Sequence, residues 1–181
     1  MGDRYVTTYL TIISLATALL VGFGQLGTSF DALVSVEAPL FVVVLLVGTI
    51  TFARLVERRA RGIEYLRAIN RVHCYFTNRD SNLRKYLYWP ANDDCPPMQI
   101  KGTALGGLRD MVAGLNSLVF GLAAGTVAKI IWPMLSSLVL ALIGAVIAVV
   151  AWLIHHRISK TNLNRAEQNL NQHVLFPQSK Q

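Results

Sequence analysis

Four long stretches with almost no charge constrain this chain more than any other feature of its sequence. No charged residue falls between Arg4 and Asp31, residues 33–53 carry only Glu37, and residues 111–128 and 130–154 carry none. A helix needs about 20 mostly apolar residues to cross the hydrocarbon core of a bilayer. The apolar runs are continuous rather than alternating, which indicates spanning helices and not the strands of a membrane barrel. The sequence therefore predicts an all-α integral membrane protein with four transmembrane helices.

The predicted spans divide the chain into two hairpins and two polar segments. Residues 1–55 form the first hairpin, with spans at about 5–25 and 37–55, and Pro39 suits the first turn of the second span. Residues 111–155 form the second hairpin, with spans at about 111–131 and 133–154. Between them lies a basic segment, residues 56–110, and residues 156–181 form a C-terminal helix and tail. We expect helices two and four to extend into a small cytoplasmic domain and to pack on each other there.

The helical period of the sequence supports that extension of the second span. Its polar continuation places several apolar residues on one side of a helix, and the arginines occupy much of the remainder. The apolar residues are Ile63, Leu66, Ile69 (or Asn70), Val72 (or His73) and Phe76. The pattern predicts one helix that runs to about residue 78.

The distribution of basic residues predicts the orientation in the membrane. Of the 17 Lys and Arg residues, eleven lie between the second and third spans, and only Lys129 falls on the opposite side of the bilayer. Basic residues next to spans are retained on the cytoplasmic side. We therefore expect both termini and the basic segment in the cytoplasm, and the protein in the plasma (inner) membrane.

Polar residues in the first hairpin are candidates for lining a pore. Thr7, Thr11, Ser14 and Gln25 share one stripe of the first helix, which suits either helix packing or a water-filled path. Glu37 lies at the outer edge of the second span. In a symmetric oligomer it would form an acidic ring that favours cation entry. The alternative is a carboxylate stabilised by the amides of a helix N-terminus.

Small residues in the second hairpin predict close helix packing. Gly121 and Gly125 form a GxxxG motif, and Gly144 and Ala148 belong to a second small-residue face. Such faces let two helix backbones approach closely in a bilayer. Two of them exceed what a minimal four-helix bundle needs, so we expect a homo-oligomer. Asn116, inside the third span, is expected to bond to a neighbouring helix.

Arginines of the basic segment are candidates for contact with anions. One interpretation is contact with anionic lipid headgroups. The other is a site for an anionic ligand such as a nucleotide, because guanidinium groups suit phosphate and Tyr88 or Trp89 could stack on a base. A protein ligand on the cytoplasmic side is a further possibility. The arginines are Arg58, Arg59, Arg61, Arg67, Arg71, Arg79 and Arg84.

No sequence motif indicates catalysis or a cofactor. The spans hold no charged residue at mid-membrane, which argues against an intramembrane protease, a proton pump or a charge-relay transporter. The chain has no HExxH and no Walker-type phosphate loop. Cys74 and Cys95 do not complete a zinc site. We expect no enzyme, no cofactor and no metal.

The sequence leaves two functions open. The first is a small oligomeric membrane channel or pore-forming effector, gated through the basic cytoplasmic domain. Its layout is similar to that of small membrane effectors of bacterial antiviral systems, without a shared motif. The second is a membrane-anchored sensor or scaffold whose cytoplasmic helices bind a partner protein.

Overall fold

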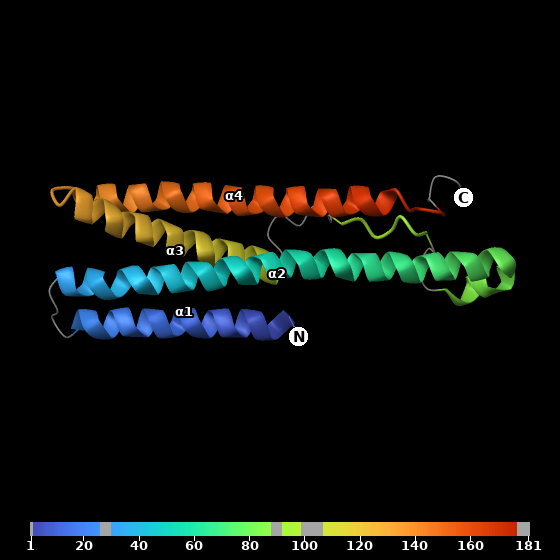
Figure 1. Cartoon of the computed structure of the whole chain (residues 1–181), viewed down its shortest axis with the longest axis horizontal. Coiled ribbons are helices and arrows are strands. Elements are labelled where there is room, and N and C mark those ends of the chain that lie inside the picture. The colour runs from blue at the N-terminus through green and yellow to red at the C-terminus, as the bar shows by residue number, and fades with distance from the viewer. Residues whose placement is uncertain (1, 26–29, 88–91, 99–106, 177–181) are drawn as a thin grey trace. The chain divides into compact units, whose positions relative to one another are not determined.

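The computed structural model describes residues 2–25, 30–87, 92–98 and 107–176. These residues form helices and turns, with no strand among them (Figure 1). The elements are α1 (Gly2–Gln25), α2 (Phe30–Arg79), the short 3-10 helix η1 (Ser81–Tyr86), α3 (Leu108–Ile131) and α4 (Ser137–Asn171). Each of the four α-helices is long and apolar enough to cross a membrane. The prediction of an all-α chain with four such helices is confirmed.

The chain divides into two compact units. The apolar unit comprises residues 1–55 and 105–158, and the basic unit comprises residues 56–104 and 159–181. α2 and α4 each contribute one part to both units. The basic unit holds twelve of the 17 Lys and Arg residues but only six of the ten Asp and Glu residues. The second and fourth helices extend beyond the apolar unit as predicted, because α2 runs to Arg79 and α4 to Asn171.

The start of the second helix differs from the prediction. α2 begins at Phe30, and Pro39 lies inside it rather than in its first turn. A proline inside a membrane helix is tolerated because neighbouring groups and small local adjustments satisfy the backbone it frees. Asp31 and Glu37 are consequently both helical, and Glu37 lies too far into α2 to bind its terminal amides. The fourth helix starts slightly later than predicted, at Ser137.

The apolar unit buries only a small core and leaves most of its large apolar side chains on the outside. Tyr9, Val44 and Val112 are almost completely buried, whereas Leu142 and Val146 on α4 are 58% and 62% exposed. In water an apolar surface of this extent would drive association. It suits a unit whose surroundings are lipid acyl chains.

The small residues of α3 and α4 pack against each other within one chain. A Cβ atom added to Gly121 would lie 2.5 Å from the Gly144 carbonyl oxygen and 2.9 Å from Ala148 Cβ. One added to Gly125 would lie 3.6 Å from the Leu140 carbonyl oxygen, an ordinary contact. Because these faces cover each other, they no longer argue for a second copy of the chain.

Candidate functional site

The polar stripe predicted for pore lining lies on the exposed side of α1. Thr7, Thr11, Ser14 and Gln25 are all exposed, whereas the packed side of α1 carries Tyr9. The Thr11 hydroxyl donates to the Thr7 carbonyl at 2.9 Å, which satisfies it within the helix. In a single chain the stripe lines no interior path, so a pore lined by it would have to form between copies.

Glu37 faces α3 inside the apolar unit. The Thr126 hydroxyl lies 3.4 Å from Glu37 Oε2 and 3.2 Å from the Leu122 carbonyl oxygen, so it shares its proton between them. Glu37 is half-buried. Its carboxylate therefore has a neutral hydrogen-bond donor on the next helix.

A polar cluster around a buried asparagine joins all four helices of the apolar unit. At its centre, Asn116 of α3 is fully buried. The Tyr9 hydroxyl donates to Asn116 Oδ1 at 3.3 Å. The Asn116 amide donates to Thr49 Oγ1 at 3.4 Å and lies 3.3 Å from His155 Nε2. Each helix thus contributes one polar side chain. Buried amide side chains in membrane helices usually form hydrogen bonds to neighbouring helices, as Asn116 does here.

The hydrogen bonds of this cluster fit one protonation state. His155 Nδ1 lies 2.8 Å from the Ala151 carbonyl oxygen, which can only accept, so Nδ1 carries the proton. Nε2 is then free to accept from the Asn116 amide. The Thr49 hydroxyl donates to the Leu45 carbonyl at 2.7 Å, which leaves its oxygen to accept as well. Every donor is matched with a neutral His155.

Gly48 of α2 makes room for this cluster. A Cβ atom there would collide with Asn116 Oδ1 and lie 2.8 Å from Asn116 Cγ and 2.9 Å from the Tyr9 ring. The aromatic rings of Phe52 and His155 meet edge to face, with centroids 4.9 Å apart. The Asn116 amide is therefore tightly enclosed, while Thr49 at the edge of the cluster is exposed; the arrangement suits adhesion between helices.

In the basic unit, Arg67 is a buried structural residue. Its side chain is 4% exposed. Nε donates to the Pro96 carbonyl at 3.1 Å, Nη1 to Asn171 Oδ1 at 2.8 Å and Nη2 to Glu167 at 3.1 Å. One guanidinium thus joins α2, the 92–98 segment and the end of α4, and the predicted packing of helix four on helix two is present.

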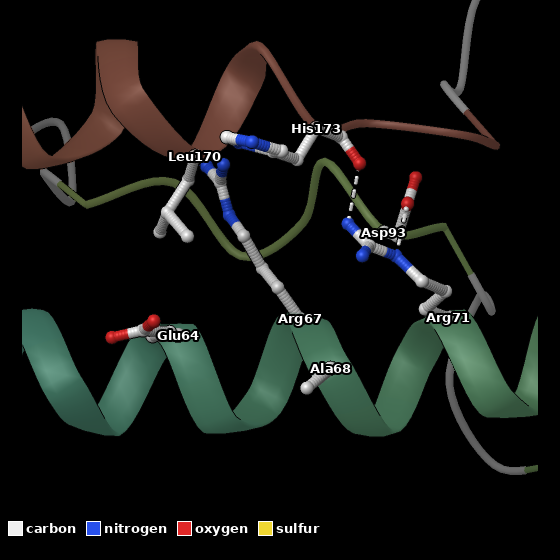
Figure 2. Close-up of a pocket in the computed structure, with 7 residues that line it drawn as sticks. All are labelled: Glu64, Arg67, Ala68, Arg71, Asp93, Leu170 and His173. Carbon is white, nitrogen blue, oxygen red and sulfur yellow. Dashed lines mark hydrogen bonds and ion pairs between the residues drawn. The ribbon is translucent and has the colours of Figure 1, made fainter.

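Arg71 and Asp93 anchor the residues that follow α4. Arg71 Nε lies 3.0 Å from Asp93 Oδ2, and Nη2 donates to the His173 carbonyl (Figure 2). The buried Asp93 carboxylate also accepts from the backbone amides of Leu175 and Phe176, both at 2.9 Å. Burial acts to raise the pKa of Asp93, but these hydrogen bonds and Arg71 outweigh it and hold the pKa below its ordinary value.

A pocket of about 260 Å³ lies beside these two arginines. Figure 2 shows Arg67 and Arg71 extending from α2 toward the other segments of the basic unit. The lining contains two arginines and two carboxylates, so its charges largely compensate. The residues are Glu64, Arg67, Ala68, Arg71, Asp93, Leu170 and His173.

The other predicted anion-binding arginines do not converge on this pocket. Arg59 donates to the Met98 carbonyl at 3.2 Å, Arg61 pairs with Glu57, and Arg79 lies 3.4 Å from the Tyr75 hydroxyl. The two remaining candidates, Arg58 and Arg84, are exposed. Neither side chain has a hydrogen bond or ion pair with another residue in the described part of the chain. The base-stacking candidates Tyr88 and Trp89 lie outside the described residues.

The outward side of α2 in the basic unit is apolar and exposed. The pattern of residues 63–76 predicts a single apolar side, but the structure divides it: Ile63 is buried, while Leu66, Ile69, Val72 and Phe76 are exposed. This outer face consists of Tyr65, Leu66, Ile69, Val72, Tyr75 and Phe76, which are 49–72% exposed. The sequence pattern places Leu66, Ile69, Val72 and Phe76 on one side of the helix. It could not show that this side is uncovered, because periodicity alone does not say which side of an amphipathic helix is packed.

Neither cysteine lies in a metal-binding arrangement. Among the described residues, no three His, Cys, Asp or Glu side chains gather where an ion could bind. Burial, followed by the nearby Asp93 charge, raises the pKa of the Cys74 thiol. Burial and Asp94 raise the pKa of the Cys95 thiol.

Comparison of the chain with models of protein families, with curated proteins and with solved structures found no match.

Proposed function

We propose that this protein is a multi-pass protein of the plasma (inner) membrane that acts by binding rather than by catalysis. The apolar unit anchors it, and the basic unit and both termini lie in the cytoplasm. The charge distribution supports this orientation, because the basic unit carries most of the Lys and Arg residues. The protein is a membrane-anchored sensor or scaffold whose cytoplasmic helices hold a partner protein.

The outer face of α2 is the observation that carries this proposal. It lies outside the apolar unit, and six large apolar side chains there are about half exposed or more. A contiguous patch of this kind marks an interaction surface in a segment that is not surrounded by lipid. The arginines give weaker support for a site that binds a soluble anion, because the guanidinium groups of Arg67 and Arg71 already pair with carboxylates of the chain.

The test is the accessibility of the outer face in native membranes. In a chain with Cys74→Ala and Cys95→Ser, single cysteines replace Val72 on the face and Gln168 on the exposed side of α4. A charged maleimide should label the cysteine at 72 much more slowly than that at 168 in membranes. After solubilisation in dilute detergent the two rates should converge. Equal rates in native membranes would contradict the proposal.

An oligomeric channel is the second candidate. The polar stripe of Thr7, Thr11 and Ser14 on the exposed side of α1 favours it, because this stripe would face a shared axis in a ring of copies. Glu37 would then set ion selectivity at the outer mouth. Ion flux through proteoliposomes, with Glu37→Gln beside the unchanged protein, tests it. A selectivity change would support the channel, and absence of flux would leave the binding function.

A further inference from the structure

We propose that the outer face of α2 binds the same face of a second copy of this chain, as a parallel helix pair. This inference rests on the proposed binding function and names its partner. Two copies anchored in one membrane have the same orientation, so their α2 helices run in the same direction. The observations that favour a second copy are the spacing, the charge and the area of the face.

The spacing is that of a two-helix seam. The outermost positions follow each other at intervals of three, four, three and four residues, the heptad pattern that keeps one side of a helix against a partner. They are Gly62, Tyr65, Ile69, Val72 and Phe76. No described atom lies within 4 Å of a Cβ placed on Gly62. The chain's own packing gives no reason for a glycine there, whereas close approach of a second helix would.

The charge of the face suits a partner identical to itself. Between residues 62 and 78, the charged side chains are Glu64, Arg67 and Arg71, and all three line the pocket on the inward side. The outer face carries none. The basic unit as a whole is strongly positive, so most of its surfaces would repel a second copy. The uncharged stretch from Gly62 to Phe76 is one where two copies can meet. The next heptad positions on either side are Arg58 and Arg79, so like charges would lie opposite each other only at the two ends of the pair.

The area is sufficient for a stable pair. From their exposed fractions, the six large side chains of the face present roughly 600 Å² per copy. Two copies could therefore bury at most about 1,200 Å² in total, the lower end of the range for specific interfaces. The shared membrane raises the effective concentration of the copies further.

Disulfide formation between copies tests the pair. In the full chain with Cys74→Ala and Cys95→Ser, reconstituted in bilayers, Ile69→Cys and Val72→Cys place single thiols on the seam. Glu64→Cys and Gln168→Cys place them off it. Under mild oxidation the seam variants should give at least about tenfold more linked dimer, because a disulfide requires Cα atoms within about 7 Å.

A second pair of variants tests the contact by introducing a charge, so the conclusion does not depend on disulfide geometry alone. Adding Ile69→Glu to Val72→Cys should lower the dimer yield at least about tenfold, because two carboxylates would be buried face to face. Adding Leu83→Glu, on the exposed 3-10 helix, should not change it. Both replaced residues are exposed in the single chain, so neither should unfold it.

The outcomes separate this inference from the proposed function. Seam-specific dimers that Ile69→Glu removes support both. No dimer, with Val72→Cys still protected from maleimide in native membranes, overturns the self-pair. Photo-crosslinking from position 65 then separates a different protein, which keeps the proposed function, from lipid, which overturns it. No dimer and full labelling of Val72→Cys overturns both proposals.

Discussion

Replacing Gly48 by alanine tests the close packing of the polar cluster in the apolar unit. The new Cβ would collide with Asn116 Oδ1 and lie 2.8 Å from Asn116 Cγ. Overpacking of this kind costs about 1–3 kcal/mol, because side chains must leave their preferred positions. The Tyr9 hydroxyl bond to Asn116 would also be disturbed. We expect the free energy of unfolding of the apolar unit to fall by about 2 kcal/mol, part of the collision being offset by the helix preference of alanine.

Gly114→Ala is the matched control for this change. No described atom lies within 4 Å of a Cβ at Gly114, so its substitution should be neutral or stabilising by up to about 1 kcal/mol. Unfolding by SDS titration in mixed micelles, followed by tryptophan fluorescence, compares the two variants. Asn116→Ala in the Gly48→Ala background removes the colliding amide, so the double variant should lose less than the sum of the single losses. Equal stability of Gly48→Ala and Gly114→Ala would refute the reasoning.

Three further predictions concern other contacts. Gly121→Ala should destabilise the α3–α4 contact by about 1–3 kcal/mol, while Gly125→Ala should have little effect, as SDS titration would show. Arg67→Lys should loosen the basic unit by about 1–3 kcal/mol, since an ammonium cannot reproduce the three-sided guanidinium contact; hydrogen exchange over residues 159–176 measures this. Because the folded pKa of Asp93 is lowered, its stabilising effect is complete above the unfolded pKa of about 3.9 and is lost as the pH falls through the folded value. Exchange protection of the Leu175 amide should therefore drop below about pH 4, and Asp93→Asn should flatten that dependence.

The helices and their apolar character could be predicted from sequence because lipid imposes long, uninterrupted apolar runs. The start of α2 could not, since Pro39 is compatible with either a helix start or a helix interior in a membrane. The continuation of α2 and α4 was visible in the periodicity. Which side of α2 is covered was not, because that depends on where the tail and the 92–98 segment pack.

The polar contacts were only partly visible in the sequence. Asn116 was expected to bond to a neighbouring helix, and the structure shows contacts with three. A further signal existed: Tyr9, Thr49 and His155 each lie within about two turns of a charged residue at the membrane boundary, so all are at similar depth. Arg67 and Glu167 are 100 residues apart, and no spacing rule links them. Their pairing therefore required the fold.

Photo-crosslinking on the outer face of α2 tests the account's central claim most directly. Tyr65 and Tyr86 are 72% and 75% exposed, and both belong to the basic unit, but only Tyr65 lies on the face. Benzoylphenylalanine at each position in turn, irradiated in intact cells, gives a matched comparison. The account predicts protein adducts from position 65, with the chain itself as the main component, and few from position 86. Lipid adducts alone from position 65, or equal yields from both positions, would contradict it.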